Sequence, residues 1–220
     1  MNSTSTSISL IDTAYVAIRQ KILSCEYMPG SLLSIYKLAK ELDMSRTPIT
    51  NAIARLELEG FVVALKNRGV IVREISSKEI IDMFEVIFAH QLYVLEFIEH
   101  FGDYTFNFTE LKEILDQQLK EKEQGNYFEY AKLSLSFIRS FISAANNNVM
   151  LQVMDAHRDK IVMSSVANYK LYPKQRRFSG AHYNSEIYEA LTMENYGKVR
   201  QLLNEFRQKT RERIMMNGSF

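Results

Sequence analysis

The chain has 220 residues, of which 46% are hydrophobic and 24% charged, and these are ordinary values for a globular protein with a substantial core. Its formal net charge of +1 excludes bulk basicity as a basis for binding nucleic acid, so any such binding would depend on the local placement of charge. The single cysteine, Cys25, excludes an intramolecular disulfide framework, and no run approaches the ~18 apolar residues of a membrane span, so we expect a cytoplasmic protein without a membrane partner.

The N-terminal part of the sequence predicts an arm followed by three short helices. The first ten residues, MNSTSTSISL, lack the basic and long apolar segments of a signal peptide, and we expect a flexible arm over residues 1–10. Apolar residues at three- and four-residue spacing then predict helices at about 12–24, 34–42 and 45–60. Asp12 is a suitable cap for the first of them.

The helix at 45–60 is predicted to have a buried and an exposed side. Pro48 falls in its first turn, where the missing N–H needs no partner. The stripe expected to be buried consists of Ile49, Ala52, Ile53 and Leu56. The other side is expected to be exposed, which makes this the candidate recognition helix, and its residues are Arg46, Thr47, Thr50, Asn51 and Ala54.

Two β-branched runs, FVVAL and VIVRE, follow on either side of a polar turn that contains Lys66, Arg68 and Gly69. This pattern predicts a β-hairpin with a basic tip. Helices that meet at a tight turn and lead into such a hairpin are typical of a winged helix-turn-helix, a DNA-binding fold. We therefore predict a DNA-binding domain over residues 11–73 and a linker over residues 74–78.

The rest of the chain predicts helices only. Ser76 and Glu79 have the spacing of a capping box. They open a helical domain, residues 79–215, with helices expected at about 77–100, 107–123, 126–145, 148–168, 175–193 and 196–214. The fold is thus predicted to be mostly α, with an N-terminal winged helix-turn-helix and a C-terminal all-helical bundle of about six helices. The first of these helices is so rich in apolar residues that it is either central to the bundle or shared with a partner chain.

Residues 29–72 resemble the GntR family of bacterial transcription regulators. The matching elements are Pro29-Gly30 with Leu33, Leu38-Ala39, SRTP at 45–48, ARLELEG at 54–60 and NRGVIV at 67–72. The helical remainder resembles the FCD effector domain of the FadR-type subclass, notably at FISAANN, residues 141–147. The resemblance implies a homodimeric regulator, more often a repressor, that binds a palindromic operator in double-stranded DNA. It also implies that a small-molecule effector in the helical domain modulates the DNA affinity.

By this resemblance, the DNA contacts fall on the second and third helices and on the wing. The residues implied are Lys37, Ser45, Arg46, Thr47, Thr50, Asn51, Lys66, Arg68 and Gly69. The family usually has Arg and Glu where this chain has Thr50 and Asn51. Because Asn can read adenine through two hydrogen bonds, we expect an operator preference that differs from the common family pattern.

Many FCD domains hold a divalent metal with one Asp and three His, and the resemblance implies that this site has changed here. The four aligned positions are Ser134, Ile138, Asn184 and Phe206. None is an expected metal ligand, so we expect no metal and no cofactor, while the old pocket is either filled or hollow. Polar and aromatic residues elsewhere in the bundle could also line a pocket for an acidic or acyl effector. The candidate effector contacts are His90, Tyr93, Ser134, Ile138, Arg158, Asn184 and Phe206.

Two other classes of function stay open. The first is a helical ligand-binding or scaffolding protein whose winged domain no longer reads DNA. The second, an enzyme, is the weakest, because the sequence contains no paired carboxylates, nucleophile–base spacing, phosphate loop or metal cluster.

Overall fold

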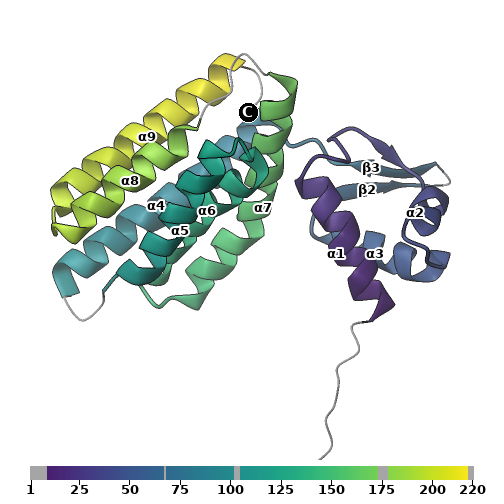
Figure 1. Cartoon of the computed structure of the whole chain (residues 1–220), viewed down its shortest axis with the longest axis horizontal. Coiled ribbons are helices and arrows are strands. Elements are labelled where there is room, and N and C mark those ends of the chain that lie inside the picture. Colours follow the sequence, from purple (N-terminus) through teal and green to yellow (C-terminus); the bar gives the residue numbers. More distant parts are fainter. Residues whose placement is uncertain (1–8, 67, 102–104, 173–177, 218–220) are drawn as a thin grey trace, which may run out of the picture. The chain divides into compact units, whose positions relative to one another are not determined.

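The computed structural model divides the chain between Glu74 and Ile75 into two units, each with its own core (Figure 1). The residues that it describes are 9–66, 68–101, 105–172 and 178–217. Residues 1–8 of the arm predicted at 1–10, and the predicted helix start at residue 175, lie outside them.

The described residues of the N-terminal unit form three helices and a small antiparallel sheet. Its elements are α1 (Leu10–Leu23), β1 (Leu32–Leu33), α2 (Ile35–Glu41), α3 (Arg46–Leu58), β2 (Val62–Leu65) and β3 (Gly69–Val72). The strand order is β1-β3-β2, so the second strand of the hairpin lies in the middle. Leu33 pairs with Val70 on one side of β3, and Ala64 pairs with Val70 on the other.

The core of the N-terminal unit forms where α1 packs against α3. Ile18 and Ile22 on α1 and Ile49 and Leu56 on α3 are all 0% exposed. Their spacing places each pair on one helix face, and burying such a side chain contributes about 1.5–3 kcal/mol. This packing holds α3 with its other side in solvent.

The start of α1 differs from the prediction. The Ser9 hydroxyl accepts a hydrogen bond from the Asp12 N–H at 3.1 Å, so Ser9 caps the helix and the expected cap at Asp12 was wrong. Leu10, which the sequence assigned to the arm, is already helical. The two-residue strand β1 was not predicted either.

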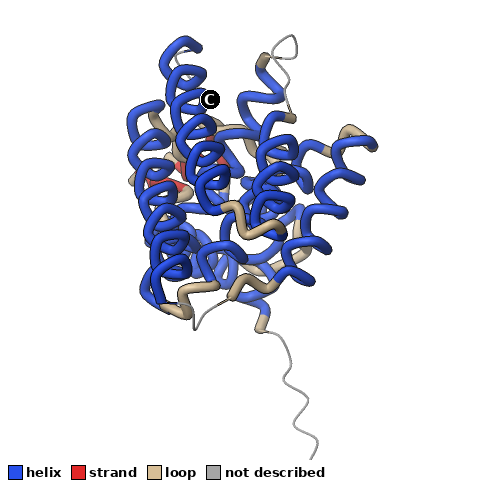
Figure 2. The backbone as a smooth tube through the Cα atoms, turned by 90° about the vertical axis from the view of Figure 1, so that its left-hand side faces the viewer, coloured by secondary structure: helices blue, strands red, loops and turns tan. Residues whose placement is uncertain are grey.

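The second unit is a bundle of helices (Figures 1 and 2), in which α6 packs against α4, α5, α7 and α8. Its described elements are α4 (Ser77–Phe101), α5 (Phe108–Glu123), α6 (Tyr127–Ser143), α7 (Asn148–Leu171), α8 (Ser179–Thr192) and α9 (Tyr196–Asn217). The prediction of a mostly helical fold, with a winged helix-turn-helix and a bundle of about six helices, is therefore confirmed. No helix in the described part of the chain is long and apolar enough to span a membrane.

The predicted capping box at the start of α4 is confirmed. The Glu79 N–H donates to the Ser76 hydroxyl at 3.2 Å, and the Glu79 carboxylate accepts from the Ser76 N–H at 3.0 Å. Beyond this cap, α4 buries Ile87 and Leu95 in the bundle and leaves Tyr93 52% exposed. The helix thus contributes to the core and also presents an apolar outer side.

Candidate functional site

The exposed side of α3 is the one that its sequence predicts. Ile49, Ala52, Ile53 and Leu56 are at most 3% exposed. The opposite side is in solvent and consists of Arg46, Thr47, Thr50, Asn51 and Ala54. The turn before α3 fixes its direction, because the Met44 N–H donates to the Ala39 carbonyl at 2.9 Å and Asp43 takes a φ of 50°. A polar helix side held out from the core in this way suits the major groove of DNA.

Arg46, at the start of α3, lies over the ring of Tyr36 on α2. The guanidinium carbon is 5.4 Å from the ring centre, and Tyr36 is 61% exposed. The sequence pointed to the adjacent Lys37, which is also exposed, and gave no signal for Tyr36. A contact between two helices leaves no spacing signal in the sequence, so only the fold reveals that Tyr36 supports Arg46.

Thr50 and Asn51 differ in how free their side chains are. The Thr50 hydroxyl donates to the Arg46 carbonyl at 2.9 Å, so its proton is used inside the helix. Asn51 is exposed, and no described residue forms a hydrogen bond with its amide. Ser45 occupies the N-cap position without a side-chain capping bond, so its hydroxyl is also available.

The wing is the ribbon of β2 and β3, with Lys66 and Arg68 exposed near its tip; Asn67 lies outside the described residues. The Arg68 N–H donates to the Leu65 carbonyl at 3.0 Å and closes the turn. Gly69 has a φ of +106°, and a Cβ there would lie 2.7 Å from the Leu33 carbonyl oxygen. Gly69 is therefore required by the close approach of β1 to β3.

The positive side chains described in this unit differ in whether a carboxylate pairs with them. Lys21 and Arg55 form ion pairs with Glu41 and with Asp12, respectively. No described carboxylate pairs with Lys37 on α2, with Arg46 at the start of α3, or with Lys66 and Arg68 on the wing. Charges without an internal partner are available to phosphates, so the unit has a local basic surface although the whole chain is nearly neutral.

The helical unit contains a cavity of about 50 Å³ among α4, α6, α7, α8 and α9. Ser134 and Ile138 on α6 and Phe206 on α9 line it, three of the positions that the resemblance aligned with metal ligands. The fourth, Asn184, is 2% exposed, and its amide donates to the Gln118 side chain at 3.0 Å. The four positions therefore lie in one region, beside a cavity of about 50 Å³.

Three other candidate effector residues lie away from this cavity. Tyr93 is exposed on α4 and stacks on Phe97 with ring centres 5.9 Å apart. Arg158 pairs with Asp159 at 3.1 Å in a separate surface groove on α5, α6 and α7. His90 lies on α4, where burial lowers the pKa of its imidazole.

Residues at the start of α8 and on α9 that contact this cavity were not predicted from the sequence. Arg213 lines the cavity, and its guanidinium donates to the Ser179 hydroxyl at 3.0 Å. The Tyr130 hydroxyl accepts from the Ala181 N–H at 2.9 Å. Gly180 allows this approach, because a Cβ there would lie 2.5 Å from the Ser134 hydroxyl. None of these contacts follows a helical repeat, so the sequence offered no signal for them.

The residues around the cavity do not fit the metal ion that the FCD resemblance implies. Ile138 and Phe206 offer only carbon atoms, and the Asn184 amide is held by Gln118. Among the described residues, no group of three or more His, Cys, Asp or Glu side chains could hold a metal ion. The described residues around this cavity therefore do not form a metal site.

Two protein-family models match the chain. The model of bacterial regulatory proteins of the gntR family matches residues 10–72, and the model of the FCD domain matches residues 107–208. An HTH-type transcriptional regulator of Agrobacterium vitis, from the TAR-I ttuE-ttuC' intergenic region, is 36% identical over 83 residues, which cover 38% of this chain and 48% of that protein. The gluconate operon transcriptional repressor of Bacillus licheniformis is 24% identical over 138 residues, which cover 62% of this chain and 55% of that protein. The chain thus spans about half the length of these curated relatives.

A solved structure of a GntR-type protein from Rhodococcus sp. RHA1 supports the fold. It is 19% identical, with a TM-score of 0.81, and the match covers 94% of this chain and 98% of that one. At this identity the likeness shows the fold alone. The two family models fall on the two units, one on each, with the winged helix-turn-helix under the first and the helical bundle under the second. The chain therefore belongs to the GntR family of bacterial transcription regulators and carries an FCD domain as its helical unit.

Proposed function

We propose that this regulator is a cytoplasmic homodimeric repressor that binds a palindromic operator and changes its DNA affinity when a small molecule enters the helical unit. The observation that carries the proposal is the set of basic residues on α2, at the start of α3 and on the wing with which no described carboxylate pairs, chiefly Arg46 and Arg68. The domain map is part of the proposal: a DNA-binding domain at 11–73, a linker at 74–78 and an effector domain at 79–215.

The DNA contacts would divide between phosphates and bases. Ser45, Thr47 and the N–H groups at the start of α3 suit phosphates, because a helix N-terminus carries partial positive charge. Lys37, Lys66 and Arg68 add backbone contacts in the same role. Arg46 and Asn51, on the exposed side of α3, are the candidates for reading base edges, and Gly69 shapes the wing beside them. Thr50, whose proton is used by the helix, is suited only to accept or to make apolar contact.

The dimer would form through the outer side of α4. Val86 is 40% exposed, Tyr93 is 52% exposed, and Ala89 lies between them at helical spacing. A twofold axis through this stripe would pair two chains. The operator of such a dimer has two half-sites about one helical turn of DNA apart. The name of the Bacillus licheniformis relative, a repressor, favours repression over activation.

The effector would act by population shift. A ligand in the cavity contacts residues of α4, α6, α8 and α9 together, so it stabilises the arrangement of these helices that it fits best. If that arrangement disfavours the DNA-bound pose of the dimer, the ligand lowers the affinity for DNA. Bound DNA then lowers the affinity for the ligand by the same factor.

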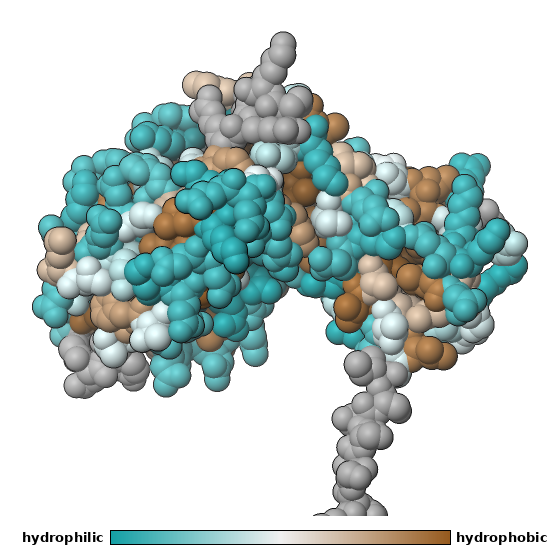
Figure 3. All heavy atoms as spheres, in the orientation of Figure 1, coloured by the Kyte–Doolittle hydropathy of each residue, from teal (hydrophilic) through white to brown (hydrophobic). Residues whose placement is uncertain are grey.

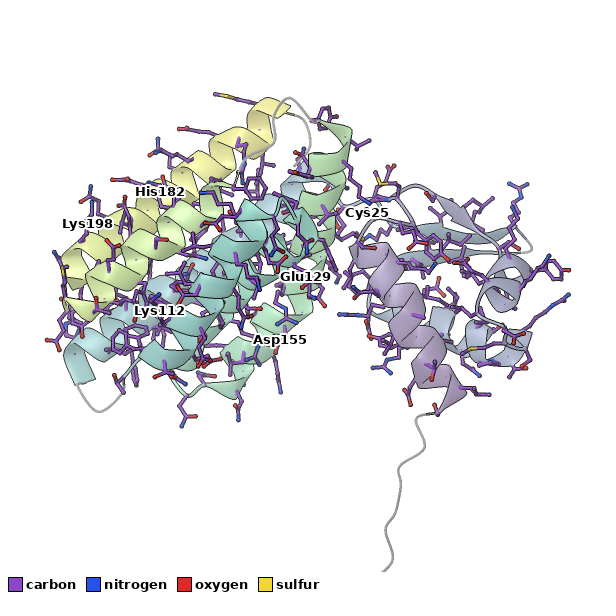
Figure 4. All side chains as sticks on the ribbon, in the orientation of Figure 1. Cys25, Lys112, Glu129, Asp155, His182 and Lys198 are labelled. Atoms are coloured by element: carbon purple, nitrogen blue, oxygen red, sulfur yellow. The ribbon has the colours of Figure 1, made fainter. Side chains whose placement is uncertain are left out.

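A binding-site selection from random double-stranded DNA, followed by gel shift on the selected duplex, tests the proposal. We expect one palindromic sequence, an affinity that falls steeply with salt, and a loss of about tenfold in affinity for Arg46→Gln. Lys198→Gln, which removes one exposed charge from α9 in the other unit, is the matched control and should bind as the wild type does (Figure 4).

Three outcomes would contradict parts of the proposal. If Arg46→Gln binds like the control, or no sequence is enriched, the winged unit does not read DNA and the ligand-binding or scaffolding alternative is favoured. If the usual guanine-containing half-site of the family is selected, Thr50 and Asn51 have not altered the operator. If the purified chain is a monomer on its operator, the dimer is excluded.

A further inference from the structure

A surface groove of the helical unit, separate from the cavity of about 50 Å³, is lined by charges of both signs. It has a volume of about 500 Å³ and lies over α6, which packs against both α5 and α7. We propose that this groove binds a short zwitterionic peptide of two or three residues, with the carboxylate of the peptide at Arg139 and its ammonium group at Glu110. This site lies outside the parts of the molecule that the proposed function uses, so it stands apart from DNA binding and from the effector cavity.

Arg139 on α6 keeps one edge of its guanidinium available to a ligand. Its Nε and Nη2 donate to the two carboxylate oxygens of Asp155 at 2.7 and 2.9 Å. A guanidinium has five N–H groups, so the edge formed by Nη1 and Nη2 is left over, and no described residue forms a hydrogen bond with it. A second carboxylate can bind that edge through two parallel hydrogen bonds. Because Asp155 already restricts the side chain, little conformational freedom is lost on binding.

The charges in the lining balance one another. Arg139 and Arg158 are positive, while Glu110 and Asp155 are negative. The hydrogen bonds to Asp155 raise the pKa of Arg139, and the negative charge of Glu110 raises it further, so both carboxylates act on one guanidinium. A lone anion would meet two carboxylates here, and a lone cation would meet two guanidinium groups. A ligand that carries one charge of each sign avoids both kinds of repulsion.

Glu110 is the carboxylate that is suited to an ammonium group. It is exposed in the first turn of α5, and the Asn107 amide donates to its Oε2 at 3.3 Å. Its Oε1 forms no hydrogen bond with a described residue. Asp155, in contrast, uses both of its oxygens to bind Arg139. The two ends of a zwitterion therefore have separate places, the carboxylate on α6 and the ammonium group on α5.

Between these two ends the groove offers a buried hydroxyl and an apolar surface. Ser140 is 2% exposed, and its hydroxyl has no hydrogen-bond partner among the described residues. Burying a hydroxyl without a partner is unfavourable, so a peptide carbonyl that accepts from Ser140 removes this penalty. Ile114 and Leu133 can contact an apolar side chain of the ligand. The groove volume lies within the ~300–1,000 Å³ of ordinary ligand sites, which leaves room for more than one amino acid.

Calorimetric titration of the full-length protein, without DNA, tests this site. The probe is the tripeptide Ala-Leu-Ala with free termini, compared with its N-acetyl form, which lacks the ammonium group, and its C-terminal amide, which lacks the carboxylate. The variants are Arg139→Gln, Glu110→Gln and Ser140→Ala. Glu113→Gln, at an exposed position of α5 outside the groove, is the control for Glu110→Gln. Arg200→Gln, which also removes an exposed interhelical ion pair, is the control for Arg139→Gln.

We expect the peptide with free termini to bind, and each capped form to bind about tenfold more weakly or less, because each loses one charge-assisted contact. Arg139→Gln and Glu110→Gln should each weaken binding of the free peptide by a similar factor, whereas both controls bind as the wild type does. Arg139→Gln should no longer distinguish the free peptide from its amide, and Glu110→Gln should no longer distinguish it from its N-acetyl form. Ser140→Ala should weaken binding about two- to tenfold and leave the thermal unfolding midpoint unchanged, since its hydroxyl has no described partner to lose.

The proposal is overturned if the free peptide does not bind, or if its capped forms bind equally well. It is also overturned if binding persists at full strength in Arg139→Gln and in Glu110→Gln, because the peptide then occupies another place. The gel shift on the selected operator is measured without peptide, so failure of this site leaves DNA binding intact. A failure of DNA binding, in turn, leaves the calorimetric result standing.

Discussion

At the scale of single residues, the arginine of the recognition helix is held by a neutral neighbour. Arg46 lies over the ring of Tyr36. A free arginine side chain has many rotamers, and ordering it on binding costs free energy. A neighbour that already restricts the guanidinium reduces that cost without competing for its charge. A neutral neighbour therefore serves recognition of an anion better than a carboxylate would.

Tyr36 should consequently matter for DNA affinity through its ring. Replacing Tyr36 with Leu removes the cation–π contact at an exposed site, which is worth about 0.5–1 kcal/mol, and should weaken operator binding about two- to fivefold. Tyr36→Phe keeps the ring and should lose less than Leu does. The measurement is a gel shift of each variant on the selected operator. Equal affinity of the Leu variant and wild type would show that Arg46 needs no support from α2.

At the scale of elements, the sequence was sufficient where a feature depends on residues close in the chain. The exposed side of α3 follows from the helical period, and the capping box of α4 follows from the spacing of Ser76 and Glu79. The strand β1 has only two residues, too few for a pattern, and forms because β3 offers it a partner. The cavity wall likewise depends on Gly180 meeting Ser134 across two helices. Features made by such non-local contacts could not be predicted from spacing.

The ion pair between α6 and α7 is a testable contact of this non-local kind. Arg139 on α6 donates twice to Asp155 on α7, at 2.7 and 2.9 Å (Figure 4 labels Asp155). The hydrogen bonds from Arg139 lower the pKa of Asp155 below its ordinary value. Stabilisation by the pair is therefore fully present above the ordinary Asp pKa of about 3.9 and is lost as pH falls through the lower pKa of the folded state.

A double-mutant cycle of Arg139→Gln and Asp155→Asn measures this contribution. Because both side chains are partly exposed, we expect a coupling of at most about 1 kcal/mol in the free energy of unfolding at pH 7. The coupling should be the same at pH 5 and should shrink below pH 4 (roughly the ordinary Asp pKa). The same cycle at Lys112 and Asp116, an exposed pair within α5, is the control and should give about 0.5 kcal/mol or less. A coupling between Arg139 and Asp155 that grows as pH falls would contradict the assignment.

At the scale of the whole molecule, the surface of the helical unit is mixed, with hydrophilic residues over much of the face drawn and isolated apolar groups among them (Figure 3). Single exposed apolar residues are ordinary on a protein surface, and Val149 on α7, 67% exposed, is one of them. The outer side of α4 differs, because Val86, Ala89 and Tyr93 follow one another at helical spacing along it. A stripe of this kind is the better candidate for a surface that a second copy covers.

Tyr93→Glu should therefore separate the two chains. A charge in the middle of a paired apolar stripe is left without a partner, and burying it is unfavourable enough to dissociate a dimer of moderate affinity. We expect the wild type to sediment as a dimer and Tyr93→Glu as a monomer. Val149→Glu, the same kind of change at an unrelated exposed site, should remain a dimer.

The same pair of variants connects assembly to DNA binding. A monomer contacts one half-site and loses the gain that comes from linking two binding units, so Tyr93→Glu should bind the palindromic operator about 10²-fold more weakly. Its affinity for a duplex with one half-site should stay unchanged, because Tyr93 and the recognition helix belong to different units. If Tyr93→Glu becomes monomeric but keeps full affinity for the palindrome, dimerisation through α4 contributes nothing to operator binding. If it stays dimeric, the two chains meet on another surface.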